Sequence, residues 1–204
     1  MISYNVLRII RKIRNFWLDM LYAGKSLQDI SARKSKDVYS GHASDYLVIS
    51  AIFDDVPVDS KDSFIDVGCG KGRVLLYISR KFKPTTITGY ELDKSTSNVA
   101  IDIGKSAGFS VLNESVFCSF PSDGTYFYLF NPFEKQMLVN FLELVAKTRF
   151  RVLIYYNPPA FTEEDIEHFL NVLMLNIETR YVKHFLLPDK LKVSYIVITK
   201  KCPT

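Results

Sequence analysis

One short segment constrains the fold more than any other: an apolar stretch that runs directly into three closely spaced glycines. Residues 63–67 (Ser-Phe-Ile-Asp-Val) predict a short buried strand, and Gly68, Gly70 and Gly72 follow it before the helical pattern of residues 73–82. Glycines adopt backbone angles that other residues avoid, and they let a ligand approach the main chain. Because ligands of open α/β sheets bind at the carboxyl ends of strands, the segment predicts a strand–turn–helix unit with a binding site at its turn.

Helix and strand patterns alternate along the rest of the chain, which predicts a Rossmann-like, doubly wound α/β sheet of about seven strands. The other expected strands span residues 86–91, 109–112, 125–130, 151–156, 178–186 and 192–200. The other expected helices span residues 43–53, capped by Ser44, then 95–107, ended by Gly108, then 134–147 and 162–175. Only a few residues around Pro188 separate the last two strands, which allows an antiparallel hairpin but no crossover. The sheet should therefore be mostly parallel, with an antiparallel last strand.

The N-terminal arm differs in charge from the rest of the chain. Residues 1–36 hold eight Lys or Arg against two Asp, whereas the remainder holds 18 basic and 20 acidic residues. An apolar stripe recurs there at helical spacing, at Val6, Ile9, Ile10, Ile13, Phe16, Trp17, Met20 and Leu21. We expect residues 1–42 to form an amphipathic basic helix with a linker or lid, and residues 43–204 to form one domain. The stripe can pack on the domain or on a second subunit, or residues 1–22 can rest on an anionic membrane surface.

Composition points to a globular protein of a reducing compartment. Of the 204 residues, 48% are hydrophobic and 24% are charged, as in a packed domain. The three cysteines, Cys69, Cys118 and Cys202, lack paired spacing and indicate free thiols. No apolar run approaches the roughly 18 residues of a membrane-spanning helix. We therefore expect a soluble, cytoplasmic protein, or one held peripherally at a membrane. His168 and His184 show no metal-ligand spacing, so we expect no metal site.

A carboxylate at the end of the second strand refines the ligand. Glu91 lies about 20 residues beyond the glycine turn, where an acidic side chain can accept both hydroxyls of a ribose. A dinucleotide fingerprint needs its third glycine at position 73 instead of 72, and Arg73 is expected to crowd a pyrophosphate. The spacing therefore favours a nucleoside without phosphates over a nicotinamide dinucleotide.

The stretch from about Ser44 to Thr199 resembles a class I S-adenosylmethionine-dependent methyltransferase, with FIDVGCGKGR as its first motif and GYELD as its acidic-strand motif. The resemblance implies that S-adenosylmethionine is the cofactor, that the glycines line its methionine part, and that Asp66 holds its amino group directly or through water. It also implies that Glu91 binds the ribose. The cofactor-binding set expected on this basis is Asp66, Gly68, Cys69, Gly70, Gly72, Glu91, Ser115 and Asn131.

The chain departs from this family after its third strand. An acidic residue usually touches the adenine amino group there, whereas this chain offers Asn113, Glu114 and Ser115 and no aspartate. The adenine contact is thus the least defined part of the expected cofactor site.

Asn131, Pro132 and Phe133 end the fourth strand and are the expected acceptor-binding residues. They resemble, with one proline missing, the Asn-Pro-Pro-Phe or Tyr motif of methyltransferases acting on amino nitrogen, or they form a turn that merely ends the strand. The resemblance implies that Asn131 accepts hydrogen bonds from an amino group and that Phe133 stacks on the acceptor. Residues 155–159 (Tyr-Tyr-Asn-Pro-Pro) should lie on the same rim, as an acceptor wall or as a plain connection. His42 is the leading general base if the acceptor is a hydroxyl.

The predicted function is methyl transfer from S-adenosylmethionine to an N or O atom of a small molecule or sugar-type metabolite. Methyl transfer needs mainly a well-positioned nucleophile, so the site residues need not be strong acids or bases. One alternative is a macromolecular acceptor, nucleic acid or protein, docked by the basic arm of residues 1–36. Another is a protein that binds the cofactor without catalysis and acts as an adaptor.

Overall fold

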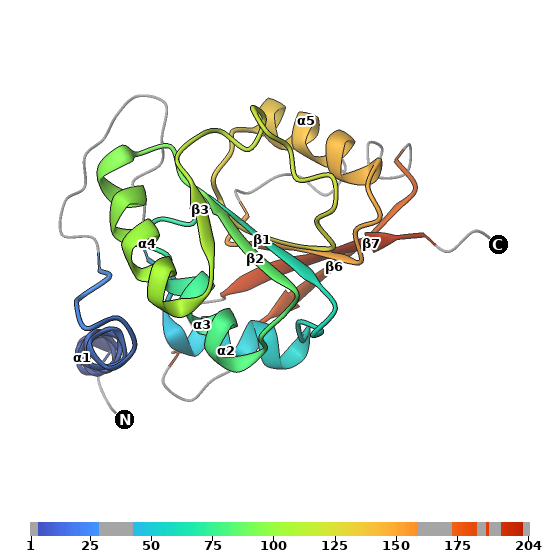
Figure 1. The fold of residues 1–204 in the computed structure, drawn as a ribbon. Coiled ribbons are helices and arrows are strands. Elements are labelled where there is room, and N and C mark those ends of the chain that lie inside the picture. Colours follow the sequence, from blue (N-terminus) through green and yellow to red (C-terminus); the bar gives the residue numbers. More distant parts are fainter. Residues whose placement is uncertain (1–3, 29–42, 159–172, 183–186, 188–192, 202–204) are drawn as a thin grey trace.

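The computed structural model describes residues 4–28, 43–158, 173–182, 187 and 193–201. In this part of the chain, seven strands form one sheet in the order β3-β2-β1-β4-β5-β7-β6 (Figure 1). The strands are β1 (Ser63–Val67), β2 (Thr86–Tyr90), β3 (Ser110–Leu112), β4 (Tyr126–Phe130), β5 (Val152–Tyr156), β6 (Leu175–Tyr181) and β7 (Ser194–Lys200). The helices are α1 (Tyr4–Ala23), α2 (Tyr46–Asp55), α3 (Arg73–Lys81), α4 (Lys94–Ala107) and α5 (Lys135–Ala146).

The strand directions confirm the predicted Rossmann-like architecture. β1, β2, β3, β4 and β5 pair in parallel, whereas β7 runs antiparallel to both β5 and β6. The strand order reverses beside β1, since β2 lies on one side of it and β4 on the other. Such a switch point leaves a crevice at the carboxyl ends of the strands, where open α/β sheets bind their ligands.

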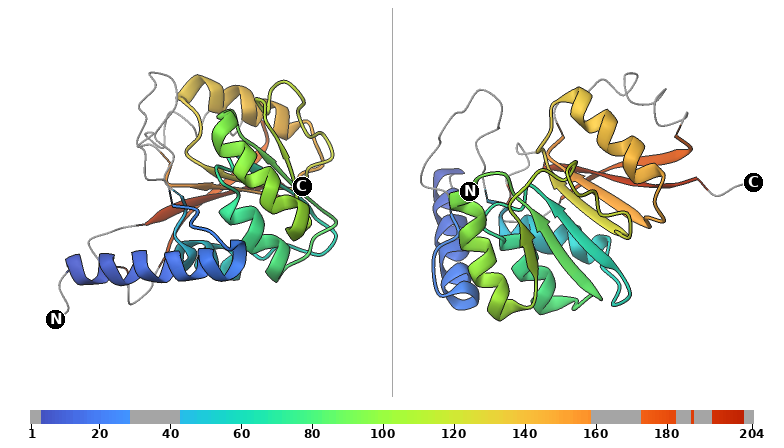
Figure 2. Two further views of the ribbon diagram at one scale, coloured as in Figure 1. Left: turned by 60° about the vertical axis from the view of Figure 1, so that its left-hand side comes forward. Right: turned by 45° about the horizontal axis from the view of Figure 1, so that its top comes forward.

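Helices cover both faces of the sheet, and the central strands are apolar for that reason. α2, α3 and α4 lie on one face and α5 lies on the other (Figures 1 and 2). In β4, Tyr126 and Tyr128 pack with Phe53 of α2, whereas Phe127 packs with Phe141 of α5. A strand buried on both faces cannot show the alternation of a half-exposed strand, so β4 reads as a continuous apolar run.

Capping residues explain where α2 and α4 begin and where α4 ends. The expected cap Ser44 is wrong, because the Asp45 carboxylate caps α2 by accepting a hydrogen bond from the Leu47 N–H at 2.9 Å. Asp93 caps α4 in the same way. Gly108 ends α4 in the left-handed region, at φ 78°, as predicted.

Two predicted elements near the C-terminus need correction. The helix expected over residues 162–175 does not extend to Leu175, which begins β6, and residues 162–172 lie outside the described residues. β6 ends at Tyr181 instead of residue 186. The predicted antiparallel pairing of the last two strands is confirmed, although the connection around Pro188 also lies outside the described residues.

The N-terminal helix is present, but it packs by the opposite side from the one that its sequence pattern suggests. α1 contacts the body through its buried polar residues Asn15 and Asp19, and Asn15 accepts a hydrogen bond from the Tyr46 N–H at 3.2 Å. The apolar stripe faces outward, and one end of α1 projects beyond the sheet and its other helices (Figure 2). The expectation that the stripe packs on the domain is therefore wrong, because the other side of α1 packs there, with the partly buried Leu18 and Tyr22 beside Asn15 and Asp19.

Candidate active site

The glycine turn after β1 has the backbone geometry that the sequence predicts. Gly68, Gly70 and Gly72 have φ of 75°, 56° and 81°, all in the left-handed region that favours glycine. The N–H groups of Gly68 and Cys69 both donate to the Tyr90 carbonyl, at 2.9 and 3.0 Å. The turn is thereby fastened to the end of β2, beside the position of Glu91.

Gly72 and Gly70 have different roles in the turn. A Cβ on Gly72 would lie 3.2 Å from Ala100 Cβ and 3.3 Å from the Phe109 ring, so Gly72 allows α3, α4 and the start of β3 to pack closely. A Cβ on Gly70 would meet nothing within 4 Å. The main chain at Gly70 therefore borders open space, as a surface that receives a ligand must.

Cys69 contributes packing rather than chemistry to the turn. Its thiol is buried, and a Cβ on Gly89 of β2 would lie only 2.6 Å from its sulfur. Burial, followed by the nearby Asp66 and Glu91 carboxylates, raises the pKa of the Cys69 thiol well above its usual range. The thiol therefore stays protonated, and only the backbone of Cys69 is available to a ligand.

Glu91 is held in place by the turn that it faces. Its Oε2 accepts a hydrogen bond from the Gly70 N–H and its Oε1 accepts one from the Asp93 N–H, both at 2.9 Å. A carboxylate has about four acceptor positions, so each oxygen keeps capacity for a ligand hydroxyl. Burial raises the pKa of Glu91, although these two N–H groups oppose the shift.

Asp66 is a buried carboxyl group with an unsatisfied oxygen. Its side chain is 2% exposed, and among the described residues its Oδ2 has no hydrogen-bond partner. Burial, followed by the charge of Glu91, raises the pKa of Asp66 well above its usual range. Two acidic groups that repel each other in a buried setting favour a cationic ligand, because a positive charge would stabilise the ionised form of both.

The region after β3 binds the main chain of the neighbouring turn. Asn113 Nδ2 donates to the carbonyls of Glu91 and Leu92, at 2.9 and 3.0 Å, so its amide fixes this turn. Ser115 Oγ accepts a hydrogen bond from the Phe117 N–H at 3.3 Å, and its contact with adenine stays a prediction. Leu92 directly follows Glu91, and its apolar side chain is 59% exposed at this turn.

The Asn131-Pro132 turn lies beside the glycine turn. Asn131 follows β4 with φ 42°, and a Cβ on Gly68 would lie 3.2 Å from Pro132 Cβ. The Asn131 Oδ1 accepts a hydrogen bond from the Tyr155 hydroxyl at 3.0 Å. The fold thus brings the predicted acceptor turn and the predicted cofactor turn together. Tyr155 belongs to the segment expected on this rim, but its bond to Asn131 was not predicted.

The aromatic side chains of this rim pack against other aromatic rings of the protein. Phe133 is 6% exposed and packs against Phe117 and Phe141, with ring centroids 5.5 and 5.2 Å apart. In this position Phe133 supports the Asn131-Pro132 turn by packing against α5. Its stacking on an acceptor stays a prediction. Phe130 and Tyr156, the last residues of β4 and β5, pair in register with ring centroids 4.5 Å apart.

The second Asn-Pro segment, after β5, repeats the geometry of the first. Asn157 has φ 50°, close to the value at Asn131, and it follows the strand that neighbours β4. Both turns therefore lie on the same rim, as predicted. Pro159 and His42 lie outside the described residues, so the general-base hypothesis for His42 stays a prediction.

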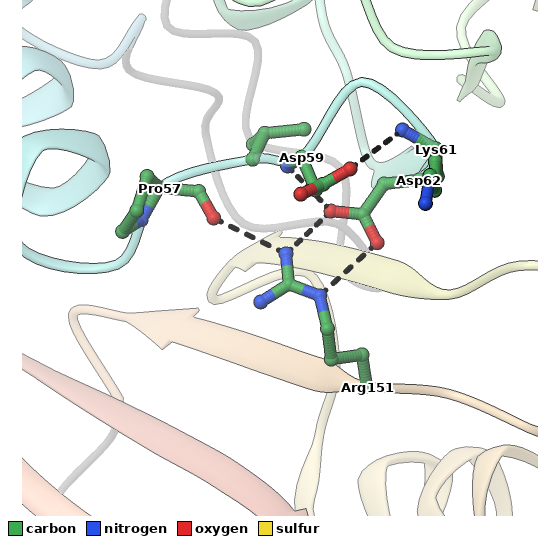
Figure 3. Close-up of a pocket in the computed structure, with 6 residues that line it drawn as sticks. Pro57, Asp59, Lys61, Asp62 and Arg151 are labelled. Atoms are coloured by element: carbon green, nitrogen blue, oxygen red, sulfur yellow. Dashed lines mark hydrogen bonds and ion pairs between the residues drawn. The ribbon is translucent and has the colours of Figure 1, made fainter.

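A pocket at the opposite edge of the sheet is lined by an ion pair that links the starts of two strands (Figure 3). Arg151, just before β5, donates to both carboxylate oxygens of Asp62, just before β1, and its Nε lies 3.1 Å from Asp62 Oδ1. Asp62 also accepts hydrogen bonds from the Asp59 N–H and the Thr125 hydroxyl, at 2.7 and 2.8 Å. Burial opposes ionisation, but these bonds outweigh it and lower the pKa of Asp62. Every acceptor position is in use, so this group ties strand starts together instead of binding a ligand.

Comparison with known proteins agrees with this geometry. The family model of histone methylation protein DOT1 matches residues 24–108, which include the glycine turn and Glu91. The fold is that of class I methyltransferases. The chain is similar to the class I S-adenosylmethionine-dependent methyltransferases in sequence over residues 24–108 and in the fold of its sheet. Among curated proteins, none matches its sequence significantly.

Three solved structures illustrate how widely this methyltransferase fold is used. An RNA methyltransferase from Salinibacter ruber, in complex with S-adenosylhomocysteine, is 14% identical over 79% of this chain and 95% of that one, with a TM-score of 0.56. An O-methyltransferase from Thermotoga maritima is 16% identical over 80% and 68% of the two chains, with a TM-score of 0.62. The [4+2]-cyclase SpnF is 11% identical over 97% of both chains, with a TM-score of 0.60. At these identities the likeness concerns the fold alone.

S-adenosylmethionine fits the residues present at this site. The open main chain at Gly70, the lone-pair capacity of Glu91 and the unsatisfied Asp66 Oδ2 suit a nucleoside that carries a cationic sulfonium and an ammonium group. Among the described residues, no three His, Cys, Asp or Glu side chains cluster as they would around a metal ion.

Proposed function

We propose that this methyltransferase transfers a methyl group to a nitrogen or oxygen atom of a small molecule held at the ends of β4 and β5. The observation that carries the proposal is the contact between the two turns, since a Cβ on Gly68 would lie 3.2 Å from Pro132 Cβ. A ligand on the glycine turn and an acceptor on the Asn131 turn would therefore be neighbours, which is the main requirement of a direct transfer.

The cofactor supplies an electrophilic methyl group on a positively charged sulfur. The protein's part is to orient the acceptor. Asn131 is suited to this, because the Tyr155 hydroxyl occupies one acceptor position of its Oδ1 and leaves a second one for an acceptor N–H or O–H. The proton that the acceptor loses on methylation would pass to water at this polar rim. His42 is the proposed base where the acceptor is a hydroxyl, whose proton is held more tightly.

A small acceptor suits the described rim better than a polyanion does. The rim offers aromatic rings and amides at Phe130, Asn131, Tyr156 and Asn157, and the nearby Arg11 is paired with the Asp45 carboxylate at 2.9 Å. A nucleic-acid site needs cations free to meet phosphates. The second candidate is a macromolecular acceptor docked by the N-terminal arm, where Arg8 and Lys12 are exposed. The third is binding without methyl transfer.

The test measures transfer from methyl-labelled S-adenosylmethionine into three separate fractions of a cell extract: metabolites, RNA and protein. We expect label in the metabolite fraction and loss of the signal in Glu91→Ala, because ribose binding would lose two acceptor oxygens. A removed hydrogen bond to a charged group weakens binding by about 1.5–3 kcal/mol, or roughly 10- to 100-fold. Label confined to RNA or protein would overturn the small-molecule acceptor. Cofactor binding with no label in any fraction would favour the adaptor.

A further inference from the structure

The outer surface of α1 is the largest group of exposed apolar side chains in the described part of the chain. Eight of its fourteen exposed large hydrophobic side chains lie on this one helix, and Trp17 and Leu21 are 66% and 72% exposed. We call these residues the α1 outer face: Val6, Ile9, Ile10, Ile13, Phe16, Trp17, Met20 and Leu21. Exposing this much contiguous apolar surface is unfavourable in water, so the face calls for a partner.

The α1 outer face lies opposite the side that holds the helix to the body. At 3.6 residues per turn its eight members fall within an arc of about 140°. The anchoring residues Leu18, Asn15 and Asp19 fall on the other side of the helix, and the last two are buried. A partner can therefore cover the outer face without displacing α1 from the protein.

The charges around the α1 outer face have one sign. Asp19 is the only acidic residue of α1, and it is buried in an ion pair with Arg73. Lys12 is exposed and borders the apolar arc, whereas Arg8 is exposed on the other side of the helix. The charge that α1 presents to a partner is thus entirely positive, which favours an anionic partner and opposes pairing with a second copy of the same helix.

The residue composition of the α1 outer face favours a lipid surface over RNA as its partner. Six of its eight residues are aliphatic, whereas single-stranded nucleic acids are bound by cations and stacked aromatic rings. A basic helix with a broad apolar arc and an aromatic anchor is suited to lie in the interface of a bilayer. No helix in the described part is long and apolar enough to cross one.

We propose that the α1 outer face binds the surface of an anionic phospholipid membrane, with α1 lying in the plane of the interface between the bilayer and the body of the protein. α1 crosses the first turns of α2 and α3, through Asn15 to Tyr46 and Asp19 to Arg73. Those turns begin at the carboxyl edge of the sheet, so membrane binding would hold the catalytic rim near the lipid surface. The proposal does not depend on the nature of the acceptor.

The test uses Trp17, which is the only tryptophan of the chain and lies within the face. Vesicles of phosphatidylcholine and phosphatidylglycerol should shift its fluorescence to the blue, and lipids brominated on the acyl chains should quench it. Vesicles of phosphatidylcholine alone should bind at least tenfold more weakly, because each basic residue near an anionic surface adds about fivefold in affinity. Lys12→Gln should lower the affinity for the anionic vesicles by about fivefold, the contribution of one basic residue.

Ile13→Asp is the decisive variant, since it places a charge in the middle of the outer face without touching a buried contact. We expect it to abolish vesicle binding. Met174→Asp is the matched control, because Met174 is 59% exposed outside α1 and its variant should bind like the original protein. Circular dichroism and thermal unfolding should be the same for both variants.

Three outcomes would overturn the proposal. The first is an unchanged Trp17 spectrum at about 1 mM anionic lipid, roughly ten times the concentration at which a single acyl chain is half bound. The second is a stable dimer by light scattering that Ile13→Asp dissociates. The third is binding to single-stranded RNA, lost in Ile13→Asp, with no binding to vesicles.

Discussion

The guanidinium of Arg73 and the carboxylate of Asp19 form a buried ion pair that joins the first turn of α3 to α1. Arg73 Nε lies 3.0 Å from Asp19 Oδ1, and Nη2 lies 2.6 Å from Oδ2. The Leu27 N–H donates to the same carboxylate at 2.9 Å, and Arg73 Nη1 donates to the Ser44 carbonyl at 2.9 Å. The sequence predicted that Arg73 would crowd a pyrophosphate, but its guanidinium is occupied by α1. Its role is to attach the N-terminal arm to the helix behind the cofactor turn.

Asp19→Ala should destabilise the protein strongly, because it leaves the Arg73 charge buried without its partner. The expected loss is about 3–5 kcal/mol of unfolding free energy, measured by urea denaturation. The double variant Asp19→Leu with Arg73→Met should lose less, since it removes both charges. Arg11→Ala, which breaks the more exposed pair with Asp45, is the control and should cost about 1 kcal/mol or less. Equal losses in Asp19→Ala and Arg11→Ala would contradict this account of the pair.

Gly70→Ala should weaken S-adenosylhomocysteine binding far more than it weakens the fold. A Cβ at Gly70 meets no protein atom within 4 Å but enters the space that borders the ligand. Its backbone strain, at φ 56°, should cost about 1–2 kcal/mol of stability. We expect a loss of affinity of at least tenfold in isothermal titration calorimetry.

Gly108→Ala provides the matched control for that strain. Gly108 also has positive φ and no atom within 4 Å of a Cβ, but it ends α4 away from the glycine turn. It should lose similar stability and keep its affinity for S-adenosylhomocysteine. If both variants bind equally well, the ligand does not lie against Gly70.

The sequence predicted the fold and the cofactor turn because both depend on local patterns. The run from Ser63 to Val67 matches β1 without a residue of error, and the positive φ of Gly68, Gly70 and Gly72 follows from their spacing in one turn. The parallel direction of most strands could be inferred from the alternation of helices and strands. The short final connection likewise predicted the antiparallel pairing of β6 and β7.

Features that depend on contacts distant in sequence could not be predicted in this way. The Tyr155 hydroxyl bonds Asn131 across 24 residues, and Arg73 reaches Asp19 across 54. The burial of Phe133 depends on where α5 places Phe141, which the strand-end motif does not contain. The outward side of α1 was misjudged for the same reason, because the partners of its inner side, Tyr46 and Arg73, are distant in sequence.

Binding of S-adenosylmethionine should release protons in mildly acidic solution. The folded protein raises the pKa of Asp66 and of Glu91, chiefly by burial, so it retains protons that the unfolded chain loses above a pH of about 4. Without ligand, stability should therefore fall as pH rises from that value through the raised pKa values. A cationic ligand favours the ionised carboxylates, so its affinity should rise with pH across the same window.

Calorimetry in two buffers of different ionisation enthalpy measures this proton release directly. Asp66→Asn should reduce the number of protons released and weaken the pH dependence of affinity. Asp102→Asn is the control, since Asp102 lies exposed on α4 and its charge is not among the causes of the Asp66 or Glu91 pKa shifts. Proton uptake on binding, or none in the original protein, would show that the cation does not lie beside these carboxyl groups.

Tyr155→Phe should impair the use of the acceptor while leaving cofactor binding unchanged. The Tyr155 hydroxyl donates to the Asn131 Oδ1 at 3.0 Å, and a neutral hydrogen bond of this kind contributes about 0.5–1.5 kcal/mol, or roughly two- to tenfold. We expect kcat/KM for the acceptor to fall by such a factor, because Asn131 would lose the partner that orients its amide. The dissociation constant for S-adenosylhomocysteine should stay the same.

Tyr126→Phe separates this positioning role from a general loss of stability. Tyr126 lies on the same strand as the Asn131 turn but near its other end, where its hydroxyl donates to the Val56 carbonyl at 2.7 Å. Removing that bond should lower the unfolding free energy and leave acceptor kinetics unchanged. Asn131→Ala should lower kcat/KM at least as far as Tyr155→Phe does, and combining the two should add little, since Tyr155 acts through Asn131. Fully additive losses would mean that Tyr155 contacts the acceptor by itself.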